Sequence, residues 1–155
     1  MLPIKNILYA TDFSPPSEYA FKMACSLAQD YGAKLLVLHV LEEPKPFYGG
    51  VMTPPPPESP SEPVRKETEI KLQELRPTNS AVAVERALVV GDAGPAITQM
   101  AETRKADLIV LGTHGRTGFG RLMLGSVAEE VLRHAPCPVL TLKSPFPPET
   151  TKPAK

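Results

Sequence analysis

Residues 107–126 read DLIVLGTHGRTGFGRLMLGS and join a short apolar run to a glycine-rich segment. The run at 107–111 has the length and the continuous hydrophobicity of a strand buried on both faces, as in parallel sheets covered by helices. The glycines that follow let backbone N–H groups approach a ligand without a Cβ in the way. The stretch therefore predicts a buried parallel strand that ends in a ligand-binding loop.

The rest of the chain alternates between similar apolar runs and patterns of helical spacing. Strands are predicted at 4–10, 35–41, 81–90, 107–111 and 137–143. Helices are predicted from Ser14-Pro15 to Gly32, along a face formed by Val64, Thr68, Leu72 and Leu75, after a cap at Asp92, and over 126–134. Such alternation specifies an α/β protein of three α/β/α layers, with a parallel sheet between helices and right-handed crossovers.

Prolines divide the chain into one domain and two accessory segments. Eight of the nineteen prolines lie in 44–63 and four lie in 144–155, so the remaining residues have an ordinary proline content. We therefore expect a single domain over 1–143, interrupted by a proline-rich loop at 44–63 and followed by a flexible tail at 144–155.

The charge and cysteine content excludes several classes of protein. Seventeen basic residues balance seventeen acidic ones, which argues against a nucleic-acid-binding protein and against a polybasic membrane anchor. No apolar run reaches the roughly 20 residues of a membrane span, and the N-terminus lacks the pattern of a signal peptide. Cys25 and Cys137 form no disulfide framework, so we expect a cytoplasmic protein.

Proteins of this architecture bind ligands beyond the carboxyl ends of the strands, at the topological switch point. That rule predicts that a ligand would bind near the strand ends at 10–12, 39–40 and 91–92, and near the segment after Leu111. Asp12 is suited to hydrogen-bond a ribose or approach Mg²⁺, although a helix cap is the alternative. His39 lies inside an apolar run and is predicted to be a hydrogen-bonded core residue rather than a catalytic base.

The glycine-rich segment suits a phosphate group. Its glycines, the basic side chains of Arg116 and Arg121, and the helix start at Ser126 together favour an anion. The alternative is purely structural, because Ser126 and Glu129 have the spacing of a capping box with Ser126 as N-cap. Neither the P-loop nor the Rossmann dinucleotide spacing is present.

The spacing Gly112-x2-Gly115-x9-Gly125-Ser126 resembles the nucleotide-binding motif of the universal stress protein family. Four further segments resemble landmarks of that family in the same order: 7–14 (ILYATDFS), 38–40 (LHV), 90–92 (VGD) and 136–140 (PCPVL). The resemblance extends over residues 2–143, and it places the chain in the branch with the complete glycine motif.

The resemblance implies a Rossmann-like sheet of five parallel strands in the order 3-2-1-4-5, of the adenine nucleotide alpha hydrolase-like type, and a homodimer paired through the fifth strand. It also implies binding of ATP or another adenine nucleotide, with Mg as a candidate companion. The residues it assigns are Ala10, Thr11 and Asp12 on the ribose and base side, Val40 at the adenine through its backbone, and Gly112, Thr113, His114, Gly115, Arg116, Gly125, Ser126 and Val127 around the phosphates.

Three functions are compatible with this sequence. The one we favour is a stress-response regulatory protein or switch that binds ATP and hydrolyses it slowly or not at all. The alternatives are a slow ATPase or phosphotransferase, and a structural stress protein with a vestigial site. Phosphoryl transfer needs an oriented nucleophile and a metal clamp, and the sequence identifies neither a catalytic residue nor a metal ligand.

Overall fold

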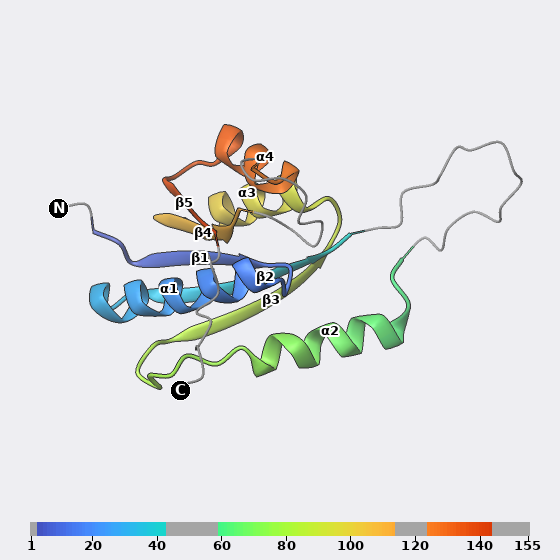
Figure 1. Ribbon diagram of the computed structural model, residues 1–155, viewed down its shortest axis with the longest axis horizontal. Helices are drawn as coiled ribbons and strands as arrows, with labels where there is room; N and C mark the ends of the chain where they lie inside the picture. Colours follow the sequence, from blue (N-terminus) through green and yellow to red (C-terminus); the bar gives the residue numbers. More distant parts are fainter. Residues whose placement is uncertain (1–2, 43–58, 114–123, 144–155) are drawn as a thin grey trace, which may run out of the picture.

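The computed structural model describes residues 3–42, 59–113 and 124–143. Strands and helices alternate along this part of the chain (Figure 1). The strands are β1 (Asn6–Thr11), β2 (Lys34–Leu41), β3 (Val84–Val90), β4 (Leu108–Gly112) and β5 (Val139–Leu142). The helices are α1 (Pro15–Tyr31), α2 (Glu62–Glu74), α3 (Ala93–Thr103) and α4 (Ser126–His134). The predicted tail and most of the predicted loop at 44–63 lie outside the described residues.

The strands form one parallel sheet in the order β3-β2-β1-β4-β5, which confirms the predicted fold class and topology. The central strand β1 pairs with β2 on one side and with β4 on the other. Because all strands run in the same direction, their carboxyl ends share one edge of the sheet. The chain reverses its direction of winding between β1 and β4, so this pair forms the topological switch point.

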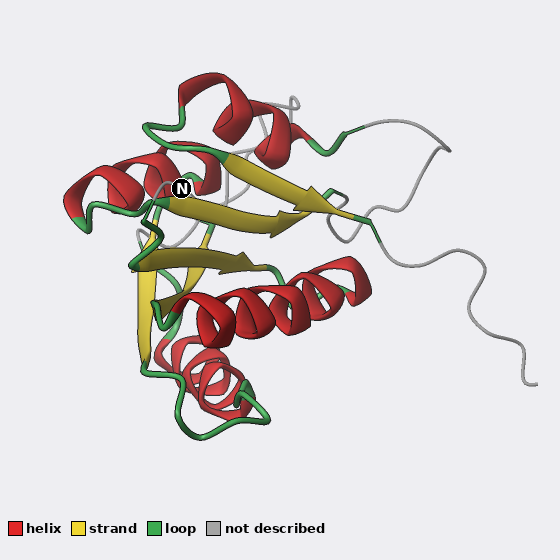
Figure 2. Ribbon diagram, turned by 90° about the vertical axis from the view of Figure 1, so that its left-hand side faces the viewer, coloured by secondary structure: helices red, strands yellow, loops and turns green. Residues whose placement is uncertain are grey.

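Helices cover both faces of the sheet (Figures 1 and 2). On one face, α1 and α2 bury a cluster that includes Tyr9, Leu35 and Leu72. On the other face, α3 and α4 bury a second cluster that includes Leu38 and Ile109. The continuous apolar runs of the central strands are explained by this arrangement, because alternate residues enter the two clusters.

The start and stop signals of α1 act as the sequence predicts. The Ser14 hydroxyl accepts a hydrogen bond from the Ser17 amide at 3.4 Å, and Pro15 occupies the first helical position. Gly32 ends the helix in the left-handed region, with φ 62°, where glycine carries no Cβ penalty.

Several predicted boundaries differ from the structure by one or more residues, and three of the differences have a local cause. Helix α2 begins at Glu62, inside the segment assigned to the loop, because Pro63 is compatible with the first helical turn. Strand β3 begins at Val84 rather than at 81, because Asn79 holds the preceding residues in a turn by accepting the Ala81 amide at 2.9 Å. Strand β5 begins at Val139, after a proline that cannot donate to the ladder.

Helix α2 is held on the sheet by a narrow set of contacts. Thr68 and Leu72 are buried, whereas Val64 is 46% exposed and does not contribute to the predicted apolar face. From β3, the guanidinium of Arg86 donates to the carbonyl of Leu72 at 2.8 Å and to the carbonyl of Leu75 at 2.7 Å. These carbonyls lie at the end of α2, where the helix itself provides no partner, so Arg86 caps the helix from the neighbouring strand.

Replacing Arg86 with alanine is expected to lower the free energy of unfolding by about 1.5 kcal/mol, because two half-buried carbonyls lose a charged donor. Chemical denaturation of the wild type and of the variant measures the difference. Arg76→Ala is the matched control, since Arg76 is exposed and, among the described residues, its side chain donates only to the Gln73 carbonyl at 3.2 Å. Equal losses in the two variants would contradict the capping role of Arg86.

Candidate functional site

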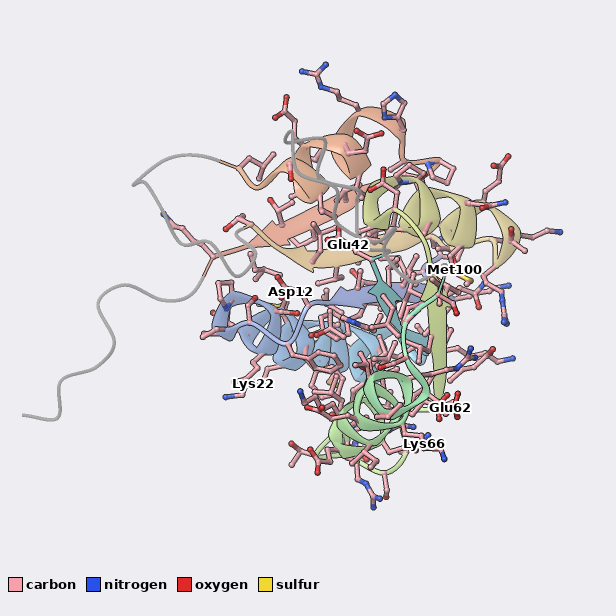
Figure 3. All side chains as sticks on the ribbon, turned by 90° about the vertical axis from the view of Figure 1, so that its right-hand side faces the viewer. Asp12, Lys22, Glu42, Glu62, Lys66 and Met100 are labelled. Atoms are coloured by element: carbon pink, nitrogen blue, oxygen red, sulfur yellow. The ribbon has the colours of Figure 1, made fainter. Side chains whose placement is uncertain are left out.

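The carboxyl edge of the sheet brings together the predicted site residues that the structure describes. Figure 3 looks onto this edge, with Asp12 just after β1 and Glu42 just after β2. The residues placed here are Ala10, Thr11, Asp12, Val40, Gly112 and Thr113 at strand ends, and Gly125, Ser126 and Val127 at the start of α4. The predicted phosphate-binding residues His114, Gly115 and Arg116 lie outside the described residues.

The last residues of β1 point in different directions. Ala10 belongs to the cluster under α3 and α4, whereas Thr11 lies on the side of α1 and is buried. The Thr11 hydroxyl accepts the Phe13 amide at 3.0 Å and the Ser17 hydroxyl at 2.9 Å. Its side chain is therefore engaged inside the protein, and its carbonyl is also occupied, since it accepts a hydrogen bond from His39.

Asp12 organises the turn between β1 and α1. Its Oδ1 accepts the amide of Ser14 at 3.0 Å and the hydroxyl of Ser14 at 2.5 Å. Ser14 is the N-cap of α1, so Asp12 supports the cap without being the cap itself. Within the described residues its Oδ2 makes no hydrogen bond, which leaves one carboxylate oxygen for a ligand.

Phe13 holds this turn in an uncommon conformation. Its φ of 60° is in the left-handed region, which costs a non-glycine residue on the order of 1 kcal/mol. The Phe13 ring packs on the His39 ring, with the centroids 4.7 Å apart. His39 in turn donates from Nδ1 to the Thr11 carbonyl at 2.7 Å, which confirms the predicted hydrogen-bonded role of this histidine.

Val40 directs its carbonyl past the last pair between β1 and β2. In β2, Lys34 bonds to the β1 side and Leu41 bonds to the β3 side, and residues two apart bond to the same side. The peptide groups of Val40 therefore face the β1 side. The last register pair between the two strands is Thr11 with His39, so Val40 lies one residue past it. Its carbonyl is placed where a base could be recognised.

Packing leaves little room for a side chain at Gly112, the first glycine of the predicted motif. A Cβ on Gly112 would lie 3.0 Å from the Ser17 amide nitrogen and 3.1 Å from the Pro16 carbonyl carbon. These are backbone atoms, which cannot move away by a change of rotamer. The absence of a side chain thus lets the first turn of α1 rest directly on the end of β4.

The two ends of the glycine-rich segment are joined by a backbone hydrogen bond. The Gly125 amide donates to the Thr113 carbonyl at 2.6 Å, and the Thr113 amide donates to Leu142 at 2.8 Å. The amino end of α4 therefore lies beside the end of β4. Gly125, not Ser126, is the N-cap, and Ser126 is the first helical residue, so the predicted capping box is wrong. The Glu129 amide bonds instead to the Gly125 carbonyl, at 2.9 Å.

Below the turn, Tyr9 is a buried polar residue that the sequence analysis did not single out. Its hydroxyl donates to the Ser17 carbonyl at 2.7 Å and lies 2.9 Å from the Ser17 hydroxyl. Burial raises the pKa of Tyr9 to about 12. The sequence gives only a weak signal for this contact, a tyrosine within an apolar strand followed by a hydroxyl residue in the next helix.

The stability of the protein is expected to fall in alkali through Tyr9. Its folded-state pKa exceeds the unfolded value of 10.0, so its contribution is complete below pH 10 and is lost as the pH rises toward 12. The loss at pH 11 is about 1.4 kcal/mol, one pKa unit. Denaturation at pH 8 and pH 11 measures it, and Tyr9→Phe should have a shallower alkaline slope. An unchanged slope would contradict the assignment.

Other chemistry is sparse in the part of the chain that the structure describes. Cys25 and Cys137 are both free and half-buried, and burial raises the pKa of each thiol, to about 11 for Cys25. Neither is therefore an activated nucleophile. Within the described residues no group of three His, Cys, Asp or Glu side chains could hold a metal ion, and no helix is long and apolar enough to cross a membrane.

A cavity of about 280 Å³ lies at the opposite, amino-terminal edge of the strands. Lys34, Glu85 and Arg104 contribute its charged side chains. Arg104 and Glu85 are already paired at 2.7 Å. Because ligands of this architecture bind at the carboxyl edge, we assign the candidate site to that edge and not to this cavity.

The fold and the arrangement at its carboxyl edge define the class of protein. It is a doubly wound α/β protein in which the start of α4 is hydrogen-bonded to the residue after β4, beside the switch point. Residues 3–143 match the sequence model of the Universal stress protein family. The chain belongs to this family.

Relatives of known sequence cover nearly the whole chain. Universal stress protein MJ0531 of Methanocaldococcus jannaschii is 36% identical over 143 residues, which span 91% of this chain and 83% of the relative. A universal stress protein of Thermus aquaticus is 39% identical over 140 residues, which span 90% and 98% of the two chains.

Solved structures share the fold. Hypothetical protein MJ0577 superposes with a TM-score of 0.74 at 25% identity, over 92% of this chain and 97% of its own. A universal stress protein in complex with cAMP superposes with a TM-score of 0.69 at 24% identity, over 93% and 100%. The Archaeoglobus fulgidus protein in complex with dAMP superposes with a TM-score of 0.62 at 24% identity, over 92% and 100%.

Proposed function

We propose that this protein binds ATP, or another adenine nucleotide, at the carboxyl edge of its sheet and acts as a regulatory switch rather than as an efficient enzyme. The observation that carries the proposal is the hydrogen bond from the Gly125 amide to the Thr113 carbonyl. It holds the helix start at the end of β4, next to the switch point, where backbone N–H groups and the helix dipole favour a phosphate.

The described residues fit an adenine nucleotide in a defined orientation. The carbonyl of Val40 suits the exocyclic amine of adenine, because it accepts a hydrogen bond past the end of β1. The Asp12 Oδ2 suits a ribose hydroxyl. The amides of Ser126 and Val127 suit the phosphates, and the Asp12 carboxylate is the described group that would hold a Mg²⁺ accompanying them. That two proteins of the same fold bind cAMP and dAMP supports adenine as the base.

Calorimetry with ATP, AMP and GTP tests the proposal. We expect ATP to bind and GTP to bind more weakly, because a carbonyl accepts the amine of adenine but opposes the carbonyl oxygen that guanine carries at the same position. Absence of binding by any adenine nucleotide at millimolar concentration would contradict the proposal.

A measurement of phosphate release then separates a switch from a slow ATPase. Release by the wild type that vanishes in both Gly115→Val and Ser126→Ala would favour the ATPase.

We further propose a cytoplasmic homodimer paired through β5. This strand lies at an edge of the sheet and all four of its residues are half-buried, so it can pair with a second copy. The two free thiols suit a reducing compartment. Light scattering measures the mass in solution, and a monomer at the concentrations used for calorimetry would contradict the pairing.

A further inference from the structure

A cluster of buried hydroxyl groups lies directly beneath the candidate site. Tyr9 and Thr11 come from β1, and Ser14 and Ser17 come from the start of α1. Their exposed fractions are 0%, 7%, 6% and 2%. Buried hydroxyls are retained where hydrogen bonds satisfy them, so each must be explained by the partners it holds.

Ser17 is the member of this cluster that contacts all the others. Its hydroxyl donates to Thr11 Oγ1 at 2.9 Å, and its amide donates to Ser14 Oγ at 3.4 Å. The Tyr9 hydroxyl secures it from below, by donating to its carbonyl at 2.7 Å. Through Thr11, whose hydroxyl also accepts the Phe13 amide, Ser17 is linked to the uncommon backbone conformation of the turn.

Ser17 also lies against the strand on the other side of the switch point. Its amide nitrogen would be 3.0 Å from a Cβ on Gly112, so the main chain of α1 and the end of β4 are in close contact. One residue therefore contacts the ends of both β1 and β4. Asp12 directly follows the end of β1. Thr113, whose carbonyl accepts the Gly125 amide, directly follows the end of β4.

We propose that Ser17 is a positioning residue for nucleotide binding: it fixes the turn that carries Asp12 relative to the end of β4 that carries the glycine motif. The role rests on the proposed function of the site. A purely structural role would be served at least as well by alanine, which is the better helix former and leaves no hydroxyl to satisfy. Without the Ser17 hydroxyl, Thr11 Oγ1 can rotate away from the Phe13 amide, and the turn can relax from its left-handed conformation.

The test compares Ser17→Ala with Thr68→Val, which also removes one buried hydroxyl but on α2. Among the described residues the Thr68 hydroxyl bonds only to the Val64 carbonyl, at 2.8 Å. In calorimetry with ATP, Ser17→Ala is expected to weaken binding about tenfold, and Thr68→Val to change it by less than about twofold. Tyr9→Phe removes the hydroxyl that donates to the Ser17 carbonyl, and it is expected to weaken ATP binding about threefold.

A readout without nucleotide accompanies the affinities. In amide NMR spectra, Ser17→Ala should shift the resonances of Asp12 and Phe13 and also those of Gly112 and Thr113, across the switch point. Wild type that binds no ATP would contradict the proposed function. Wild type that binds, with both Ser17→Ala and Tyr9→Phe unchanged in affinity, would contradict the positioning role alone. If Ser17→Ala does not fold, an unchanged ATP affinity of Tyr9→Phe contradicts the positioning role, and a weakened affinity supports it.

Discussion

Replacing Gly112 with valine is expected to lower the free energy of unfolding by about 3 kcal/mol, near the upper end for overpacking. The Cβ alone would lie 3.0 Å from the Ser17 amide nitrogen and 3.1 Å from the Pro16 carbonyl carbon, and valine adds two methyl groups to it. Both belong to the backbone of the first turn of α1, so relief requires the helix to move away from β4. That movement would also separate the two strand ends of the site, and ATP affinity is expected to fall at least about tenfold.

Gly32→Asn is the control for the Gly112 variant. Gly32 ends the same helix in the left-handed region, and a Cβ there would meet nothing within 4 Å. Asparagine tolerates that conformation, so the control is expected to lose less than about 1 kcal/mol and to keep its ATP affinity. Denaturation and calorimetry measure both variants. A Gly112→Val protein as stable and as tightly binding as the control would contradict the packing of α1 on β4.

Replacing Gly125 with proline is expected to weaken ATP binding about thirtyfold, or about 2 kcal/mol. Gly125 has φ −62°, which proline adopts without strain, so the substitution mainly removes the N–H that donates to Thr113 at 2.6 Å. The start of α4 would then lose the bond that holds it beside the end of β4, and the amides of Ser126 and Val127 would no longer be fixed for the phosphates.

Gly125→Ala separates the amide from the side chain. Alanine also adopts φ −62° and ψ 152°, and it retains the N–H. We therefore expect the alanine variant to bind ATP more tightly than the proline variant, by about tenfold, in the same calorimetric titration. Equal affinities would show that the closing hydrogen bond does not support the site.

The features predicted correctly depend on patterns that are local in the sequence. The apolar runs predicted the strands and their parallel arrangement, the family resemblance predicted their order, and Ser14 and Gly32 bounded the first helix as predicted. Boundary errors arose where a short-range signal was misread. The spacing of Ser126 and Glu129 suggested a capping box, but the bond from Gly125 to Thr113 makes Gly125 the cap.

Contacts between distant segments could not be predicted from the sequence. Nothing near Arg86 indicates that its guanidinium caps α2, eleven to fourteen residues earlier. Gly112 was predicted for its value to a phosphate, and its contact with Pro16 became visible only when the fold placed α1 on β4. The engagement of the Thr11 hydroxyl within the protein was hidden for the same reason, since the sequence does not show which face a strand-end side chain takes.

An ATP titration followed by amide NMR tests the central claim most directly, that the carboxyl edge of the sheet is the nucleotide site. The account predicts that the largest shifts occur at Asp12, Val40 and the residues from Gly125 to Val127. It predicts no comparable shifts at Lys34 or Glu85, which line the cavity at the amino-terminal edge. Shifts confined to that opposite edge, or the absence of any shift at saturating ATP, would contradict it.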